Sequence, residues 1–300
     1  MMSIFNMPIQ AYSTPSIAKE VLTELLLNGS LCLFLGAGVS ESSKSYPSWR
    51  TLVEHCIAGA GVEHQLPDNA VTEDLLVAMD VVRGSLRDED LKALVQRFLQ
   101  KDFELDYSHA KNMLLIALGA LVMTSKRGSI DQIITYNFDD LIEWYFDLHG
   151  YKTQVVSRLP YISQDSDVTV FHPHGFLPKS TKYKMSDHFI FDQLSYDLTI
   201  GRDDNPWFAL SKQLLLSKVA IMVGVSGDDP AIRALLARVN EQLSAANAPR
   251  PVAFLLNRAT SIEKPSSYYL ARGIVPLSFD TYDDIWAFLL GICQNAASMY

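Results

Sequence analysis

Residues 36–40 of this 300-residue chain read Gly-Ala-Gly-Val-Ser and follow directly on the apolar run 31–35. Glycines after a buried strand let the backbone approach a phosphate closely, and the amide groups that begin the next helix favour its negative charge. The segment lacks the third glycine of the dinucleotide-binding fingerprint, and the acid expected about 20 residues later, at the end of a second strand, is missing. By itself the segment indicates either a phosphate-binding loop or a tight strand–helix turn without a ligand.

Two polar residues follow the apolar run 130–136 in the same way. Asn137 offers an amide and Asp139 a carboxylate, and such groups at the end of a strand can orient a sugar or a water molecule. The alternative is helix capping, because asparagine is a good N-cap and early aspartates suit the helix dipole.

A histidine pair follows the apolar run 168–171, and a glycine turn ends the run 219–225. His174, followed by glycine, could act as a general base, because an unperturbed histidine titrates near neutral pH. His172 and His174 could instead bind a metal, but no third ligand is obvious, and one or both could be structural. Residues 224–229 could hold a second part of a dinucleotide, or form a turn capped by Asp229.

The pattern of apolar residues predicts the elements that position these groups. Short apolar runs predict strands at 31–35, 130–136, 153–156, 168–171, 219–225, 252–256 and 274–277. Helical spacing predicts helices at 17–27, from residue 47, and at 138–149, 206–216, 230–243 and 283–292. Residues 68–126 carry helical signals only, and we interpret them as a helical module inserted after the first strand–turn–helix unit.

This order predicts an α/β fold, with residues 1–300 as a single domain. The expected architecture is a doubly wound, mostly parallel Rossmann-like sheet with an inserted helical module. Ligands of such sheets bind beyond the carboxyl ends of the strands, where all four polar segments are expected to lie.

Composition argues against several classes of function. Apolar residues make up 48% of the chain and charged residues 20%, which is ordinary for a soluble globular protein. A net charge of −9 and a pI of about 5.2 argue against nucleic-acid binding. The three cysteines are far apart and too few for a four-cysteine zinc site, so we expect reduced thiols and no metal. Without a secretory signal or an apolar run long enough to span a bilayer, the chain is expected to be cytoplasmic.

Together and in this order, the motifs resemble those of the sirtuin superfamily, and specifically its prokaryotic sirtuin-like branch, whose members act as NAD hydrolases in antiphage defence. The sirtuin segment Gly-Ala-Gly-Ile-Ser corresponds to residues 36–40, and Gly-Ile-Pro-Asp-Phe-Arg to residues 45–50, Ser-Tyr-Pro-Ser-Trp-Arg. Thr-Gln-Asn-Ile-Asp reads Thr-Tyr-Asn-Phe-Asp at 135–139. The His-Gly pair and a late Gly-x-Ser follow at 174–175 and 224–226.

The resemblance implies a role for each matching residue. Asn137 would hold the nicotinamide ribose, and His174 would be the base that acts on a ribose hydroxyl or on the attacking water. Asp139 would face the carboxamide. The remaining contacts to NAD would come from Gly36, Ala37, Gly38 and Ser40 at the pyrophosphate, and from Gly224 and Ser226 at the adenosine half. Trp49 would cover the reactive sugar in place of the sirtuin phenylalanine, and Arg50, which keeps the sirtuin arginine, would also contact NAD.

The departures from the sirtuin pattern favour hydrolysis over deacylation. The four-cysteine zinc module is missing, Ser48 replaces the aspartate and Tyr136 replaces the glutamine. The helical segment 68–126 stands where an acyl-lysine channel could otherwise form, so bound NAD would most simply react with water. We therefore expect an NAD⁺ glycohydrolase that releases nicotinamide and ADP-ribose, or a cyclic variant of it.

Three alternatives stay open at this point. The domain could bind NAD or ADP-ribose as a sensor without turnover, act as a protein deacylase, or, least favoured, be a dehydrogenase. A free NAD hydrolase would harm its own cell, so the resemblance also implies restraint by self-assembly into a homo-oligomer or by a partner such as an ATPase or an Argonaute-type protein. The sequence identifies neither the partner nor the activating trigger.

Overall fold

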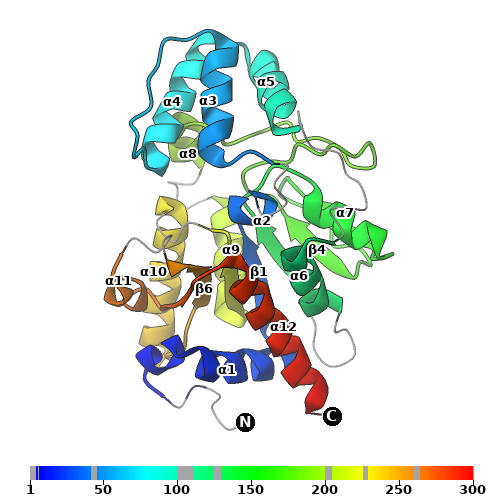
Figure 1. Cartoon of the computed structure of the whole chain (residues 1–300), viewed down its shortest axis with the longest axis vertical. Coiled ribbons are helices and arrows are strands. Elements are labelled where there is room, and N and C mark those ends of the chain that lie inside the picture. Colours follow the sequence, from blue (N-terminus) through cyan, green and yellow to red (C-terminus); the bar gives the residue numbers. More distant parts are fainter. Residues whose placement is uncertain are drawn as a thin grey trace.

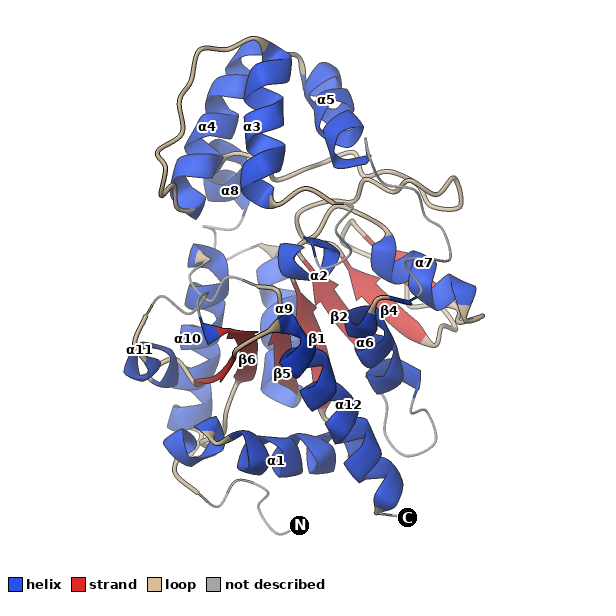
Figure 2. Cartoon of the chain, viewed as in Figure 1, coloured by secondary structure: helices blue, strands red, loops and turns tan. Residues whose placement is uncertain are grey.

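Seven strands form one parallel sheet in the described part of the chain (Figures 1 and 2). The computed structural model describes residues 5, 7–41, 46–100, 111–123, 130–199, 205–225, 229–259 and 264–299. The strands, in chain order, are β1 (Leu31–Leu35), β2 (Gln132–Thr135), β3 (Thr153–Val156), β4 (Val168–Phe171), β5 (Val219–Val223), β6 (Ala253–Arg258) and β7 (Ile274–Phe279). Their order in the sheet is β3-β4-β2-β1-β5-β6-β7, and every neighbouring pair is parallel.

The strand order reverses at β1, which confirms the predicted doubly wound fold. β1 pairs with β2 on one side and with β5 on the other, and the later strands continue outward from these two. Loops that leave β1 and β5 therefore diverge, which opens a crevice at the carboxyl edge of the sheet. All residues of β1 and β5 are buried, as expected for continuous apolar runs in a sheet covered on both faces.

Helices cover both faces of the sheet, and alternate residues of β1 face different helices. Leu31, Leu33 and Leu35 share a core with α1 (Pro15–Leu27), α6 (Met113–Met123), α7 (Leu141–Leu148) and α12 (Tyr282–Ser298). Cys32 and Phe34 share the opposite core with α9 (Pro206–Ser217), α10 (Pro230–Ala245) and α11 (Ser266–Leu270). The short helix η1 (Ile9–Ser13) precedes α1 in the chain, and the short helix α2 (Ala37–Glu41) follows β1.

A separate layer of helices, here called the cap, lies beyond the carboxyl edge of the sheet (Figure 1). It consists of α3 (Trp49–Ala60), α4 (Thr72–Ser85), α5 (Asp88–Gln100) and α8 (Gln193–Thr199). α3 packs against α4 and α5, and α4 packs against α8. The helices expected at 68–126 thus occupy two places, because α6 packs on α12 beside the sheet rather than in the cap. None of the described helices is long and apolar enough to cross a membrane.

Candidate functional site

The crevice between β1 and β5 is closed at its base by three glycines in direct contact. The Gly36 amide donates to the Val223 carbonyl, and the Gly38 amide donates to the Gly224 carbonyl, each at 3.1 Å. A Cβ on Gly36 would overlap the Gly224 carbonyl oxygen, and one on Gly38 would lie 2.8 Å from the Gly224 Cα. Gly224 has φ +66°, and a Cβ there would lie 2.7 Å from the Val39 amide nitrogen. The glycines are therefore required by the close approach of two turns, whether or not a phosphate binds above them.

A cavity of about 590 Å³ opens above this contact, between the sheet edge and the cap. Every site residue expected from the sequence and lying within the described ranges lines it: Gly36, Ala37, Gly38, Ser40, Trp49, Arg50, Asn137, Asp139, His174 and Gly224. Ser226 lies outside the described residues. The cavity is also lined by residues that the sequence interpretation did not assign to it, including Tyr46, Tyr196, Asn257 and Tyr282.

Ser40, Asn137 and Asp139 form a buried chain of hydrogen bonds on the cavity wall. The Asn137 side-chain amide donates to Ser40 Oγ at 2.8 Å, and Ser40 Oγ donates to Asp139 Oδ2 at 2.7 Å. Asp139 Oδ1 accepts from the Leu141 amide at 3.1 Å. Burial raises the pKa of Asp139 to about 6, against the lowering effect of the Ser40 and Leu141 donors. The protein itself thus fixes the position of Asn137.

The capping alternative for Asn137 is wrong, because α7 begins at Leu141 rather than at residue 138. The side chain of Asn137 is used by Ser40, and the intervening residues stay outside the helix. Asp140, directly before the helix, turns its carboxylate to the amides of Lys179 and Ser180, at 3.0 and 2.8 Å. These contacts to distant segments override the local tendency to start the helix earlier.

The two histidines after β4 differ in environment. His172 is fully buried, with Nδ1 3.0 Å from the Asn137 carbonyl and Nε2 2.7 Å from Glu143 Oε1. Because a carbonyl only accepts, His172 Nδ1 donates the bond to Asn137, and Nε2 forms a hydrogen bond with the Glu143 carboxyl group. His172 therefore has a structural position beneath Asn137.

His174 instead lines the cavity, between two tyrosine rings. Its ring centroid lies 4.8 Å from that of Tyr136 and 6.2 Å from that of Tyr196. Its Nε2 atom is buried, and among the described residues it has no hydrogen-bond partner. Burial lowers the pKa of His174 to about 4, and the charge of Asp229 acts in the opposite direction. At neutral pH the ring is uncharged, so one of its nitrogens has a free lone pair.

Trp49 and Arg50 approach the cavity from the start of α3. Ser48 is the N-cap of this helix and accepts a hydrogen bond from the Thr51 amide at 3.2 Å. This capping role explains why a serine stands at the position of the sirtuin aspartate. The Trp49 ring lies 6.4 Å from that of Phe138. Arg50 donates to Glu54 and to the carbonyls of residues 67 and 68, so its guanidinium ties α3 to the loop before α4. A contact of Arg50 with a ligand stays a prediction.

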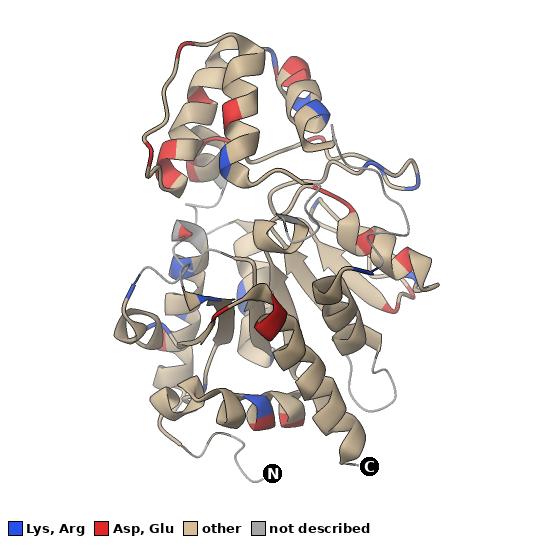
Figure 3. Ribbon diagram, in the orientation of Figure 1, with Lys and Arg blue, Asp and Glu red and all other residues tan. Residues whose placement is uncertain are grey.

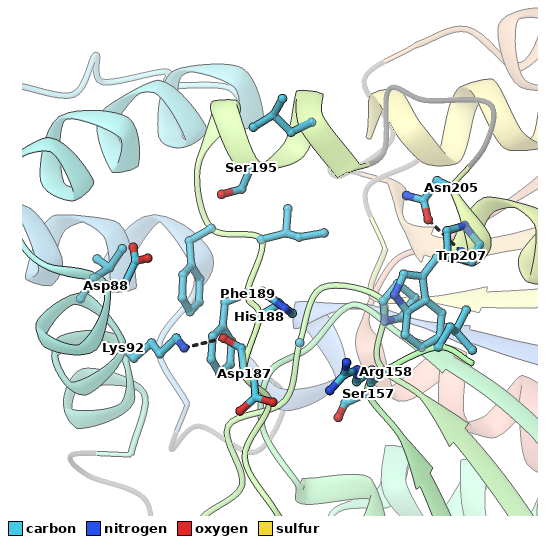
Figure 4. Close-up of a pocket in the computed structure, with 18 of the residues that line it drawn as sticks. Asp88, Lys92, Ser157, Arg158, Asp187, His188, Phe189, Ser195, Asn205 and Trp207 are labelled. Carbon is cyan, nitrogen blue, oxygen red and sulfur yellow. Dashed lines mark hydrogen bonds between the residues drawn. The ribbon is translucent and has the colours of Figure 1, made fainter. Parts of the chain in front are cut away.

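A second cavity of about 760 Å³ lies between the cap and the loops after β3 and β4 (Figure 4). Figure 4 shows Lys92 reaching the Asp187 carbonyl from the cap side, with Arg158 and Trp207 on the side of the sheet. On the cap side, Arg83 forms ion pairs with both Asp88 and the buried Asp192. Ile190 lines both cavities, and Pro173 and Gly175, on either side of His174, line this one.

Positive and negative side chains are scattered over the surface in view and do not gather in one basic face (Figure 3). Among the residues that the structure describes, no group of three or more His, Cys, Asp or Glu could hold a metal ion. The cavity wall therefore offers hydrogen-bonding groups, a neutral imidazole and aromatic rings, which suit a small organic ligand.

Residues 131–277 match the family model of the SIR2-like domain. This SIR2-like segment contains Asn137, Asp139, His174 and Gly224, whereas the glycine turn at 36–40 and Trp49 lie before it. No curated protein matches the chain. The segment that contains Asn137 and His174 is thus the one that matches this family model.

Solved structures of Sir2 proteins cover most of the chain at low identity. A Sir2 enzyme is 13% identical, with a TM-score of 0.45, over 94% of this chain and 97% of that chain. A Sir2 homologue in complex with NAD is 16% identical, with a TM-score of 0.48, over 92% and 94%. A mutant Sir2 homologue in complex with ADP-ribose is 15% identical, with a TM-score of 0.43, over 94% and 98%.

Proposed function

We propose that the chain is an NAD⁺ glycohydrolase that cleaves the bond between nicotinamide and ribose. The observation that carries the proposal is the juxtaposition of Asn137 and His174 in the cavity of about 590 Å³, within a segment that matches the SIR2-like domain. His174 is uncharged, and its Nε2 has no hydrogen-bond partner within the described part of the chain. A sensor that only binds the dinucleotide does not need such a histidine in the wall of its cavity, whereas a hydrolase does.

The proposed reaction breaks the C1′–N bond of the nicotinamide ribose, and the electron pair leaves with nicotinamide. Nicotinamide is already cationic in NAD⁺, so its departure needs no strong acid. A water molecule then adds to the oxocarbenium-like C1′ and loses its proton, giving ADP-ribose, nicotinamide and H⁺. Because this carbon is strongly electrophilic, the water needs orientation more than activation, which a weak base can supply.

In this mechanism the residues of the chain orient the ribose and the attacking water, and they exclude other water molecules. His174 accepts a hydrogen bond or proton from the water, or from a ribose hydroxyl, and Asn137 holds the ribose. Ser40 and Asp139 fix the amide of Asn137 through bonds of 2.8 and 2.7 Å. Trp49 and Tyr196, which line the cavity from the cap, limit the access of other water molecules.

We further infer, from the resemblance to the prokaryotic sirtuin-like branch, an effector that depletes NAD in antiphage defence. In that setting activity is restrained until a trigger arrives, through self-assembly or through an ATPase or Argonaute-type partner. Chromatographic sizing of the purified protein, combined with an NAD⁺ cleavage assay of each fraction, tests this part separately. A monomer that is active without any trigger would contradict it.

The test of the proposed function separates cleavage from binding. Purified protein is incubated with NAD⁺, the products are separated by chromatography, and NAD⁺ binding is measured by calorimetry. We expect nicotinamide and ADP-ribose in equal amounts, with no acylated peptide present. Binding without release of nicotinamide at any protein concentration would favour the sensor, and release only with an acylated peptide would favour the deacylase.

A further inference from the structure

One hydrogen bond joins the cap to the sheet side directly beside His174. Tyr196 belongs to α8 of the cap, and its hydroxyl donates to Asp229 Oδ1 at 2.7 Å. Asp229 directly precedes α10, and the same oxygen accepts from the Ile232 amide at 3.1 Å, so it also caps that helix. Both residues line the cavity, so their bond joins the two layers at its wall.

Hydrogen bonds join the start of α8 to α4. The Leu194 amide donates to Asp80 Oδ1 at 3.1 Å, and the buried Asp192 accepts from Arg83 at 2.7 Å. Asp192 also accepts from the Ser195 amide at 2.8 Å, which caps the start of α8. The Tyr196 hydroxyl joins α8, which is bonded to α4 in this way, to Asp229 at the start of α10.

The aromatic ring of Tyr196 also covers the cavity through apolar contacts. It packs with Leu76 and Ile190 in a small buried cluster against Trp49, and only 6% of its surface is exposed. Its ring meets that of His174 edge to face at 6.2 Å. If α8 moved away from α10, the cavity wall would open and His174 would become exposed at the same time.

We propose that the Tyr196–Asp229 hydrogen bond is a latch that keeps the cap closed over the cavity, and that Tyr196 is a positioning residue of this site. The inference rests on the proposed function for its effect on NAD, but the latch itself is a property of the fold. It gives a physical route for regulation, because an event that separates α8 from α10 opens the cavity and weakens its hold on NAD⁺.

Asp229 adds an electrostatic effect that can be separated from the latch. Among the residues that the structure describes, the titratable groups found against His174 are Tyr136, Tyr196 and Asp229, and the carboxylate of Asp229 raises the pKa of His174. Asp229→Asn keeps an oxygen for the Tyr196 hydroxyl and for the helix cap but removes the charge. It should leave α8 closed and move the acidic limb of the kcat/KM profile to lower pH.

The test uses Tyr196→Phe, which removes the hydroxyl and keeps the ring. Tyr183→Phe is its matched control, because the Tyr183 hydroxyl also donates to a carboxylate, Asp147 Oδ2, at 2.7 Å but outside the cavity. Hydrogen–deuterium exchange over residues 193–198 measures closure without any need for catalysis. We expect about tenfold faster exchange in Tyr196→Phe than in wild type or in Tyr183→Phe, from loss of one charge-assisted bond.

NAD cleavage gives the second measurement. In Tyr196→Phe the KM for NAD⁺ should rise about tenfold, with kcat changed less than about threefold, because the reacting groups are kept and closure is lost. Unchanged exchange over 193–198 in Tyr196→Phe overturns the latch, whatever the kinetics. If exchange increases while the wild type releases no nicotinamide, the latch stands and the proposed function fails.

Discussion

Gly38 and Gly224 lie in backbone contact across the crevice of the sheet, with the Gly38 amide donating to the Gly224 carbonyl at 3.1 Å. One comes from the turn after β1 and the other from the turn after β5, so this contact joins the two halves of the doubly wound sheet where they diverge. Any side chain at either position would push the two turns apart beneath the candidate site.

Gly224→Ala should destabilise the fold more than an alanine at an open glycine of similar conformation. At φ +66° an alanine costs about 1–2 kcal/mol, and its Cβ would also lie 2.7 Å from the Val39 amide nitrogen, which adds about 1–3 kcal/mol. Gly29→Ala is the control, because the φ of Gly29 is +64° and a Cβ there would have nothing within 4 Å. Denaturant unfolding measures both variants, and equal losses would contradict the role of the contact.

Asp139 should make the fold less stable as the pH rises from about 4 to 6. Burial raises its pKa from 3.8 to about 6, so in this window the folded state binds more protons than the unfolded state. The free energy of unfolding should fall by up to about 3 kcal/mol through this group. Comparing the pH dependence of unfolding in wild type and Asp139→Asn isolates the effect. A slope that is identical in the two proteins would show that the carboxyl group is not desolvated.

Glu143→Ala should be strongly destabilising, because it leaves buried His172 Nε2 without its partner at 2.7 Å. Breaking a buried pair by removing one member costs about 3–5 kcal/mol. Glu54→Ala breaks the exposed contact with Arg50 on α3 and should cost less than about 1 kcal/mol. Chemical denaturation of the two variants measures the difference. A loss in Glu143→Ala no larger than in Glu54→Ala would mean that His172 does not depend on this carboxyl group.

The sheet could be predicted from the sequence because each buried parallel strand is a short apolar run. The run 31–35 corresponds to β1, and the run 219–225 to β5, which ends two residues earlier at Val223. The polar residues after these runs reach one cavity because parallel strands end at the same edge. Whether the residues act on NAD as the resemblance implies stays a prediction.

Other features depend on contacts between distant residues and could not be predicted. The seven-residue α8 carries the sequence Gln-Leu-Ser-Tyr-Asp-Leu-Thr, which has little helical pattern, so Tyr196 was not expected in the cavity. The start of α7 depends on Ser40, which lies 97 residues before Asn137 in the chain. The glycines indicated a close backbone approach, but their partner proved to be another turn of the same chain. Asp229 was expected as a helix cap or as part of a dinucleotide-binding turn, and its bond with Tyr196 was not expected.

The central claim is that His174 serves a hydrolytic NAD site, and nicotinamide release from NAD⁺ tests it most directly. The rate is measured over a range of protein concentrations for wild type, His174→Ala and His149→Ala, an exposed histidine at the end of α7. We predict that His174→Ala lowers kcat/KM by about 100-fold or more, as loss of a positioned base should, while His149→Ala matches the wild type. Equal rates in wild type and His174→Ala, with both variants folded, would contradict the account.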